Sequence, residues 1–448
     1  MEIILVLLVS VAVLIVSLYL YRIASGTLVF LNIPNIFFYF YVLMVYVGSI
    51  LMYLGLDMAS LYLGATDKII LTKMLLSTMS GMVLIPCGMI LANMVFRFDA
   101  KQSFDQYWTA KVERIVSPRD TYVFPFMIIV VAISIVALVM YLRQLSTIPI
   151  VALFGGASPA ELAYLRSQAT NNFGNHIHRY SLFYQHIIPH LSRVVFVYYL
   201  SDNKSLWIRF LTFFMICLSL FTQSMALYKE PVVFYLVSLF IIYFYVKSDK
   251  YNVGKTIKIA VLSFLMITII YVLVMNTGGR SFFDTMLLPL NRMLVGQIRP
   301  LYFYYAMIPQ TQNFLLGKAF PNPGGLLPFE PYPLVVEVMN FMYPHLRNSN
   351  IVGTAPTVFW GEVYANFGYF SIFPSMVVFG FLIQTIHIIF VKRIRKTAFS
   401  LATYVYLMIL IKNLNGMPLS YLLVNIYIIS IILVNMFIRV MGRSLSKI

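Results

Sequence analysis

The segment Ile3–Leu20 reads IILVLLVSVAVLIVSLYL, eighteen consecutive residues without a charged side chain. A helix needs about 20 mostly apolar residues to cross the hydrocarbon core of a bilayer, so this segment predicts a transmembrane helix. Only Glu2 lies between it and the first residue, whereas a cleavable signal sequence would carry a basic start and a clean small-residue cleavage site. We therefore interpret the segment as a retained first span.

Ten further apolar stretches follow, at about residues 36–54, 74–96, 122–142, 184–200, 207–227, 231–246, 257–275, 369–391, 399–412 and 419–438. The composition agrees with this pattern, since 61% of the residues are hydrophobic and only 10% are charged, against about 25% charged in soluble domains. The sequence predicts an all-α polytopic membrane protein with about 11 spans, forming one integral membrane domain over residues 1–448. The stretch at 231–246 is short and follows Lys229-Glu230-Pro231, so a broken pair with its neighbour is an alternative.

The basic residues indicate which ends of these spans face the cytoplasm, because short cytoplasmic loops are rich in Lys and Arg. Short connections on one side hold 19 of the 32 Lys and Arg residues, mainly in 97–119, 247–258, 392–396 and the C-terminal tail. Most of the net charge of +17 is therefore explained by the orientation of the chain in the membrane. We expect no nucleic-acid partner. The N-terminus is then external, as are two long connections, 143–183 and 276–368, which would be periplasmic in a bacterium.

Eight arginines remain on the external side, where the same rule should deplete basic residues. They are Arg143, Arg166, Arg179, Arg193, Arg280, Arg292, Arg299 and Arg347. Because a guanidinium presents a planar fork of donors that suits phosphate, this set predicts a site for an anionic group. The alternative is that these side chains reach lipid headgroups or pair with the acids Glu161, Asp284, Glu330, Glu337 and Glu362.

The second connection, 276–368, is rich in aromatic residues and contains Trp360, which argues against disorder. Arg280 follows two glycines whose backbone N–H groups can turn toward an anion. Arg292 and Arg299 are seven residues apart and would share one face of a helix, which we interpret as re-entrant or interfacial. A twelfth span is the alternative, but it would place the basic segment 392–396 outside.

The first connection, 143–183, predicts an amphipathic helix around Glu161–Arg166, followed by a polar stretch with Asn171, Asn172, Asn175, His176, His178 and Arg179. No third ligand converges on the two histidines, so neutral sugar binding by Asn and His is favoured over a metal site. His186 and His190 share a helical face, yet packing explains them as well as function does, and we assign them no role.

Glu362 is the carboxylate nearest the start of a predicted span, and it lies one helical turn before Asn366. A carboxylate in such a place is costly unless it is paired or used, so an ion pair with Arg347 or Arg280 is the alternative to a catalytic role. No nucleotide-binding loop or hydrolase elbow occurs, and Cys87 and Cys217 lie in apolar runs without metal-ligand neighbours. We therefore expect neither a metal nor another cofactor.

The segment 353–368, GTAPTVFWGEVYANFG, looks like the block that ends the second external loop of Wzy-type O-antigen polymerases, and the whole chain resembles them in architecture. The resemblance implies a GT-C-like glycosyltransferase in the bacterial inner membrane, with its active site facing the periplasm. Such an enzyme transfers a growing glycan from one undecaprenyl-pyrophosphate carrier to another lipid-linked oligosaccharide repeat unit. A chain-length regulator and membrane lipids would be its further partners.

The resemblance also implies roles for individual residues. Arg280 and either Glu362 or His178 would form the catalytic group, with the carboxylate or imidazole taking the acceptor proton. Two sets of residues would bind substrate. The arginines would bind phosphate or glycan, and the aromatic side chains would contact sugar or the prenyl chain. These residues are Arg166, Arg179, Arg292, Arg299, Arg347, Trp360 and Tyr364.

Two other functions fit the same architecture. An O-antigen ligase would use the same carrier but move the glycan to a lipid core. A lipid-linked oligosaccharide flippase or secondary transporter would explain many spans with charges inside the membrane, although such folds tend to show internal repeats, and none is visible between the two halves.

Overall fold

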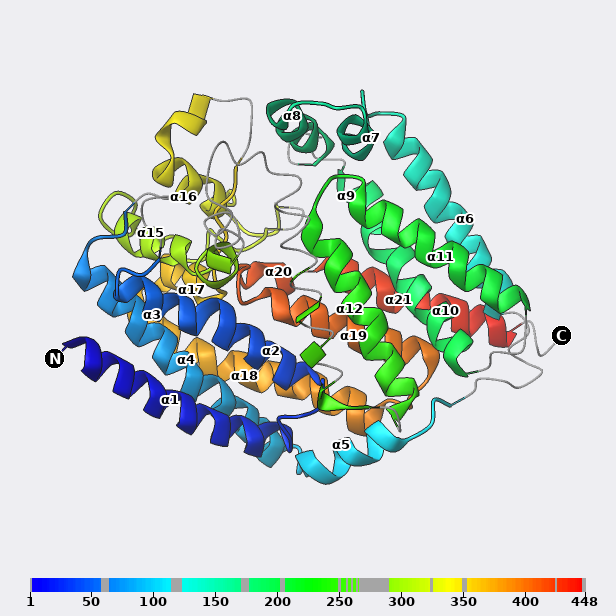
Figure 1. Cartoon of the computed structure of the whole chain (residues 1–448), viewed down its shortest axis with the longest axis horizontal. Helices are drawn as coiled ribbons and strands as arrows, with labels where there is room; N and C mark the ends of the chain where they lie inside the picture. Colours follow the sequence, from blue (N-terminus) through cyan, green and yellow to red (C-terminus); the bar gives the residue numbers. More distant parts are fainter. Residues whose placement is uncertain are drawn as a thin grey trace. The chain divides into compact units, whose positions relative to one another are not determined.

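The fold was analysed in a computed structural model of the chain, shown in Figure 1. The structure describes residues 2–444 apart from 58–63, 114–122, 171–176, 202–205, 249–250, 255–256, 259–260, 263–264, 266–289, 323–324, 349–352 and 424. The described residues form helices and connecting turns, with no strand among them. The prediction of an all-α chain is confirmed.

Eight helices in the described part of the chain are long and apolar enough to cross a membrane. They are Ile3–Ser25, Ile33–Tyr53, Lys68–Val95, Val123–Leu142, Leu206–Ser224, Lys229–Val246, Tyr369–Arg393 and Ser420–Met441. Each coincides with one of the predicted spans, and helices Leu206–Ser224 and Lys229–Val246 are separate elements. Repeated apolar helices of this length define a multi-pass membrane protein.

The other three predicted spans differ from these eight. The stretch 399–412 forms helix α19, Ala398–Asn413, which is shorter than a full span. The stretch 184–200 lies within a continuous helical segment from Ile177 to Ser201 that carries several polar side chains. Most of 257–275 lies outside the described residues.

The chain divides into two compact units. Unit 1 comprises Met1–Gln106, Thr268–Arg393 and Leu410–Val424. Its helices are α1 (Glu2–Ser25), α2 (Ile33–Tyr41), η1 (Val42–Tyr46), α3 (Val47–Tyr53), α4 (Lys68–Val95), α15 (Arg299–Met307), α16 (Leu334–Met342), η7 (Pro344–Asn348), α17 (Trp360–Phe367), η8 (Tyr369–Ser371), α18 (Ile372–Ile388), η9 (Ile389–Arg393) and α20 (Ser420–Leu423).

Unit 2 comprises Tyr107–Ile267, Ile394–Ile409 and Asn425–Ile448. Its helices are α6 (Val123–Leu142), α7 (Pro149–Phe154), α8 (Pro159–Ala169), α9 (Ile177–Ser181), η4 (Leu182–Ile187), α10 (Ile188–Ser201), α11 (Leu206–Ser224), α12 (Lys229–Val246) and α21 (Ile426–Ser444). Helices α5 (Ala100–Thr109) and α19 each have residues in both units.

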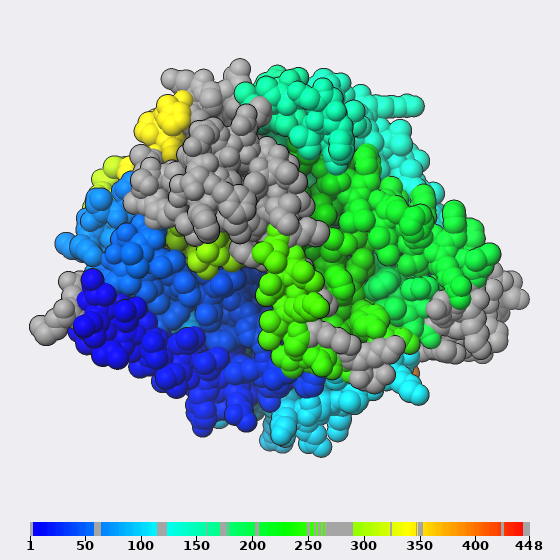
Figure 2. Space-filling model, in the orientation of Figure 1, coloured from blue at the N-terminus to red at the C-terminus, as the bar shows by residue number. Residues whose placement is uncertain are grey.

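Helix α18 packs along α4 and forms the most extensive contact in unit 1 (Figure 1). Two glycines permit this close approach, because a Cβ on Gly88 would meet the backbone of Val377 and one on Gly380 would meet the backbone of Ile85. Small residues commonly allow such backbone contact between membrane helices. Helix α1 packs on the other side of α4 and exposes aliphatic side chains along its outer face (blue in Figure 2), as expected of a helix that faces lipid.

The two ends of unit 1 have different neighbours. At one end, the backbone N–H of Asp67, which precedes α4, donates to the hydroxyl of Tyr302 in α15, with N and O 3.1 Å apart. At the other end, Lys392 Nζ donates to the carbonyls of Phe96 and Arg97, which follow α4. The described part of the second connection therefore gathers at the end of α4 that is remote from this basic cluster.

Candidate functional site

The candidate site is built around Glu362 in α17. The Glu362 side chain is buried, with 3% of the residue exposed, and its Oε2 accepts a hydrogen bond from the backbone N of Ser420 at 2.7 Å. Burial raises the pKa of this carboxyl to about 7, against an ordinary value of 4.5, and the hydrogen bonds from Ser420 and Leu419 lower it only in part. Within the described ranges, no basic side chain lies at ion-pair distance from Glu362.

Asn366 connects helix α17 to the chain segment around Gly317 by hydrogen bonds. Its Oδ1 accepts hydrogen bonds from the backbone N–H groups of Gly317 and Ala319, at 2.8 and 3.2 Å, and its Nδ2 donates to the carbonyl of Glu362 at 2.9 Å. The helix ends at Gly368, whose φ of 85° and ψ of −178° are accessible almost only to glycine. The backbone that carries Glu362 is therefore fixed by contacts on both sides.

Tyr304 of α15 lies beside this carboxylate. Its hydroxyl donates to the carbonyl of Ala355 at 3.3 Å, and burial raises its pKa above the usual range, with a further contribution from the negative charge of Glu362. The hydroxyl therefore stays protonated at neutral pH. Glu362 is thus the ionisable group of this cluster that titrates near neutrality.

The two aromatic residues predicted to face substrate are packed inside unit 1. Trp360 is completely buried, with its ring centroid 5.7 Å from that of Tyr41 and 5.2 Å from that of Phe359. Tyr364 is 6% exposed, and its hydroxyl donates to the carbonyl of Ile308 at 2.5 Å. Both side chains hold α17 in place, and their contact with sugar or prenyl chain stays a prediction.

The described arginines of the second connection have different surroundings. Arg299 is buried and forms an ion pair with Asp57, a carboxylate outside the acids considered from the sequence. Arg347 is exposed and lies 3.6 Å from Glu337, so the alternative pairing of Arg347 with Glu362 is not formed. Arg292 is exposed, and a turn at 295–298 separates it from Arg299, so one helix face does not carry both guanidinium groups. Arg280 lies outside the described residues.

The first connection is described only in part. Arg166 of α8 is half-buried, with its guanidinium 5.0 Å from the ring centroid of Tyr228, and Arg179 of α9 is exposed. His178 belongs to α9, but its side chain lies outside the described part, as does the whole stretch 171–176 with His176. The expected roles of these residues stay predictions.

Unit 2 contains a row of polar side chains formed by two histidines to which the sequence analysis assigned no role and by one of the eight arginines expected on the external side. His186, His190 and Arg193 follow one another at i, i+4 and i+7, which places them on one face of the helical segment 177–201. Nδ1 of His186 lies 3.1 Å from the hydroxyl of Tyr406, and Nε2 of His190 lies 3.1 Å from Oδ1 of Asn435. The spacing of these three residues in the sequence is the signal that indicates a shared helical face.

Arg193 is the charged member of this row and is 6% exposed. Its Nε donates to Ser238 Oγ at 2.7 Å, and its guanidinium lies over the rings of Tyr235 and Tyr406, at 5.5 and 5.9 Å from their centroids. Among the residues that the structure describes, no acid pairs with it. Hydroxyl and aromatic partners therefore take the place of a counter-ion.

These features define a multi-pass helical membrane protein with a buried carboxylate that has no basic partner among the described residues. The described residues contain no group of three or more His, Cys, Asp or Glu side chains that could hold a metal ion, and both cysteines are free and exposed. No protein-family model, curated protein or solved structure matches this chain.

Proposed function

We propose that the protein is a glycan polymerase that transfers a growing chain from one undecaprenyl-pyrophosphate carrier to a second lipid-linked repeat unit. The observation that carries the proposal is the state of Glu362: buried, without a basic partner among the described residues, and with a pKa of about 7. A carboxyl poised near neutral pH is suited to accept a proton from a sugar hydroxyl. The resemblance of segment 353–368 to the polymerase block supports the same assignment.

The chemistry divides into proton removal and departure of the diphosphate. The acceptor hydroxyl oxygen forms a bond to the anomeric carbon of the donor sugar, and its proton passes to the Glu362 carboxylate. The bond between that carbon and the phosphate oxygen breaks, and undecaprenyl pyrophosphate leaves with the bonding electron pair. Arg280 and the exposed Arg292 would stabilise the negative charge on the diphosphate. Guanidinium groups in this role make a metal ion unnecessary.

The proposed setting is the inner membrane of a bacterium, with the site on the periplasmic side. The described part of the second connection lies at the end of unit 1 that is remote from Lys392 and Arg97, and basic residues favour the cytoplasmic side. About 11 spans in a GT-C-like arrangement complete the proposal, since the three remaining predicted stretches add to the eight long helices.

The direct test is incubation of the purified protein with a lipid-linked repeat unit and no nucleotide. We expect a series of products that differ by one repeat unit, formed at a rate that rises with pH through about 7 as Glu362 loses its proton. The polymerase proposal is rejected if folded protein forms no such products. It is also rejected if the protein instead moves intact lipid-linked units across a vesicle membrane.

Variants assign the proton acceptor in the same assay. Glu362→Gln should lower the rate by at least about 100-fold, as expected for loss of a general base. Glu330→Gln is the matched control, because Glu330 is an exposed glutamate of the same connection. If His178→Gln abolishes polymerisation and Glu362→Gln does not, the imidazole takes the proton. Arg280→Ala should stop chain growth while single repeat units remain.

A further inference from the structure

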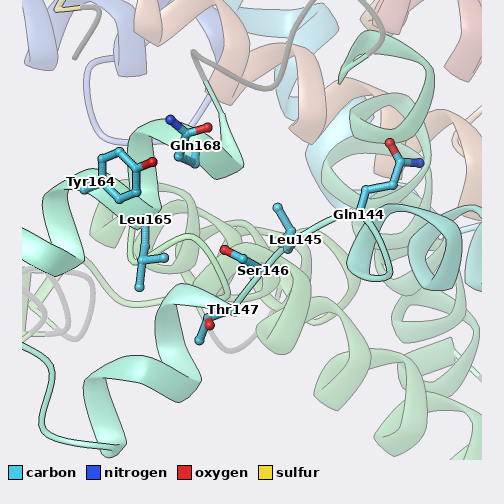
Figure 3. A pocket seen from close by; sticks show the side chains of 7 residues that line it. All are labelled: Gln144, Leu145, Ser146, Thr147, Tyr164, Leu165 and Gln168. Carbon is cyan, nitrogen blue, oxygen red and sulfur yellow. The ribbon is translucent and has the colours of Figure 1, made fainter. Parts of the chain in front are cut away.

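A pocket of about 340 Å³ lies in the first connection of unit 2, shown in Figure 3. Its wall comes from two segments, the turn after α6 and one face of α8. The lining residues are Gln144, Leu145, Ser146, Thr147, Tyr164, Leu165 and Gln168. Its volume is at the lower end of the range of about 300–1,000 Å³ found for ligand sites, and it suits one or two sugar rings.

The polar groups of this pocket are available for a ligand. Gln144 is oriented by its own hydrogen bonds, since its Nε2 donates to the carbonyl of Met140 at 3.2 Å and to the hydroxyl of Tyr180 at 2.8 Å. These bonds use only the amide nitrogen, so the Gln144 amide oxygen can still accept a hydrogen bond. Across the pocket, the Gln168 amide has no side-chain partner among the described residues. The two amides come from the two segments that form the pocket, and each can hydrogen-bond a hydroxyl group of a sugar.

Tyr164 is the aromatic residue of the pocket lining. Tyr164 is 48% exposed, and it lies one helical turn before Gln168, so both side chains project from the same face of α8 (Figure 3). An exposed ring of this kind offers an apolar face, while its hydroxyl remains in water. Leu165, which also lines the pocket, is buried in contrast. One aromatic face beside amides and hydroxyls is the combination that matches the apolar and polar faces of a sugar ring.

The lining excludes other ligand classes. None of the seven lining residues carries a charge, so the pocket lacks the cations that a phosphate or a uronic acid requires. Five of the seven are polar, so a prenyl chain would leave their hydrogen-bonding groups desolvated at a cost. We propose that this pocket binds a neutral sugar of the glycan substrate through Tyr164, Gln168 and Gln144.

The proposal differs from the sequence prediction of sugar binding by Asn and His, which concerned the stretch 171–178. It rests on the proposed function only in that a glycan substrate brings the sugar to this pocket. A neutral sugar held in the first connection would give one repeat unit a binding contact of its own, made by residues other than Glu362. It would therefore contribute to substrate affinity without taking part in proton transfer.

The test is binding of free sugars to the detergent-solubilised full chain, measured by saturation-transfer NMR. The probes are neutral mono- and disaccharides together with oligosaccharides released by mild acid from the surface polysaccharide of the source cell. Glucuronic acid and a short neutral peptide serve as probes of other ligand classes, and inorganic phosphate, which has no C–H protons to observe, is added as a competitor for the sugar signal. We expect a neutral sugar to bind, and Tyr164→Ala and Gln168→Leu each to weaken it about fivefold to tenfold.

Gln102→Leu is the matched control, because Gln102 is an exposed glutamine of α5 that does not line the pocket. Tyr164→Phe keeps the ring and should retain most of the affinity. Binding that is unchanged in Tyr164→Ala and Gln168→Leu, preference for phosphate or peptide, or no binding by any neutral sugar would overturn the proposal. The binding assay needs no lipid carrier, so its outcome is independent of the polymerisation assay. If the protein binds the sugar but forms no polymer from the lipid-linked repeat unit, only the proposed polymerase function is rejected. If it forms polymer but Tyr164→Ala and Gln168→Leu leave sugar binding unchanged, only the proposed pocket is rejected.

Discussion

Replacement of Glu362 by Gln should make the protein more stable above pH 7 even though it removes the proposed proton acceptor. The carboxyl is buried and its pKa is raised from 4.5 to about 7, so the folded state holds its proton more tightly than the unfolded state does. The stability from this group is complete below about pH 4.5 and is lost as pH rises through about 7. The full difference corresponds to roughly 3 kcal/mol.

Most of that loss falls between pH 5 and pH 8, and we expect it to be roughly 2 to 3 kcal/mol for the wild type. Gln keeps an acceptor oxygen for the N–H of Ser420 but cannot ionise, so Glu362→Gln should lack this decrease. The free energy of unfolding would be measured in mixed micelles at both pH values by tryptophan fluorescence. Glu330→Gln should behave as the wild type does, since Glu330 is exposed. An equal pH-dependent loss in wild type and Glu362→Gln would refute the assignment of the raised pKa to this carboxyl.

Two further variants test the packing of the units. Arg299→Met should destabilise the protein by about 3–5 kcal/mol, because it leaves the Asp57 carboxylate buried without its partner, and Asp57→Asn combined with Arg299→Met should restore much of the loss. A double variant no more stable than Arg299→Met in mixed-micelle unfolding would contradict this. Lys396→Met should cost about 2–3 kcal/mol, since the buried Lys396 Nζ donates to three carbonyls at the end of α5 at 2.7–3.0 Å and methionine leaves them without this donor. We expect backbone amide hydrogens at the end of α5 to exchange faster in Lys396→Met than in the wild type. Unchanged exchange there would contradict the stabilising role of Lys396.

The membrane-spanning helices were largely predictable because the hydrocarbon core imposes a length and a composition that each segment must satisfy by itself. Eight predicted stretches coincide with long apolar helices. The helix at 398–413 is shorter, and the segment 177–201 carries buried polar groups, so simple apolar length described them less well. Boundaries moved where a capping residue starts the helix, as Asp67 does for α4.

The sequence also predicted that Glu362 must be either paired or used, because a carboxylate near a span is costly in isolation. It could not predict the partner, which is the backbone of Ser420, fifty-eight residues further along the chain. The same limit applies to Arg299, which was expected to hold phosphate and lies against Asp57, 242 residues away in the sequence. Nothing local to either residue encodes these contacts.

Hydropathy and charge along the chain thus determined the class of the protein, the places of most spans and the choice of Glu362 as a residue of interest. Only the tertiary structure decided which polar groups meet, Glu362 with Ser420 and Arg299 with Asp57, and which residues line the pocket of unit 2. The physical reason is that transfer into a bilayer is a property of each segment alone. The partner of a buried charge depends on how distant helices pack.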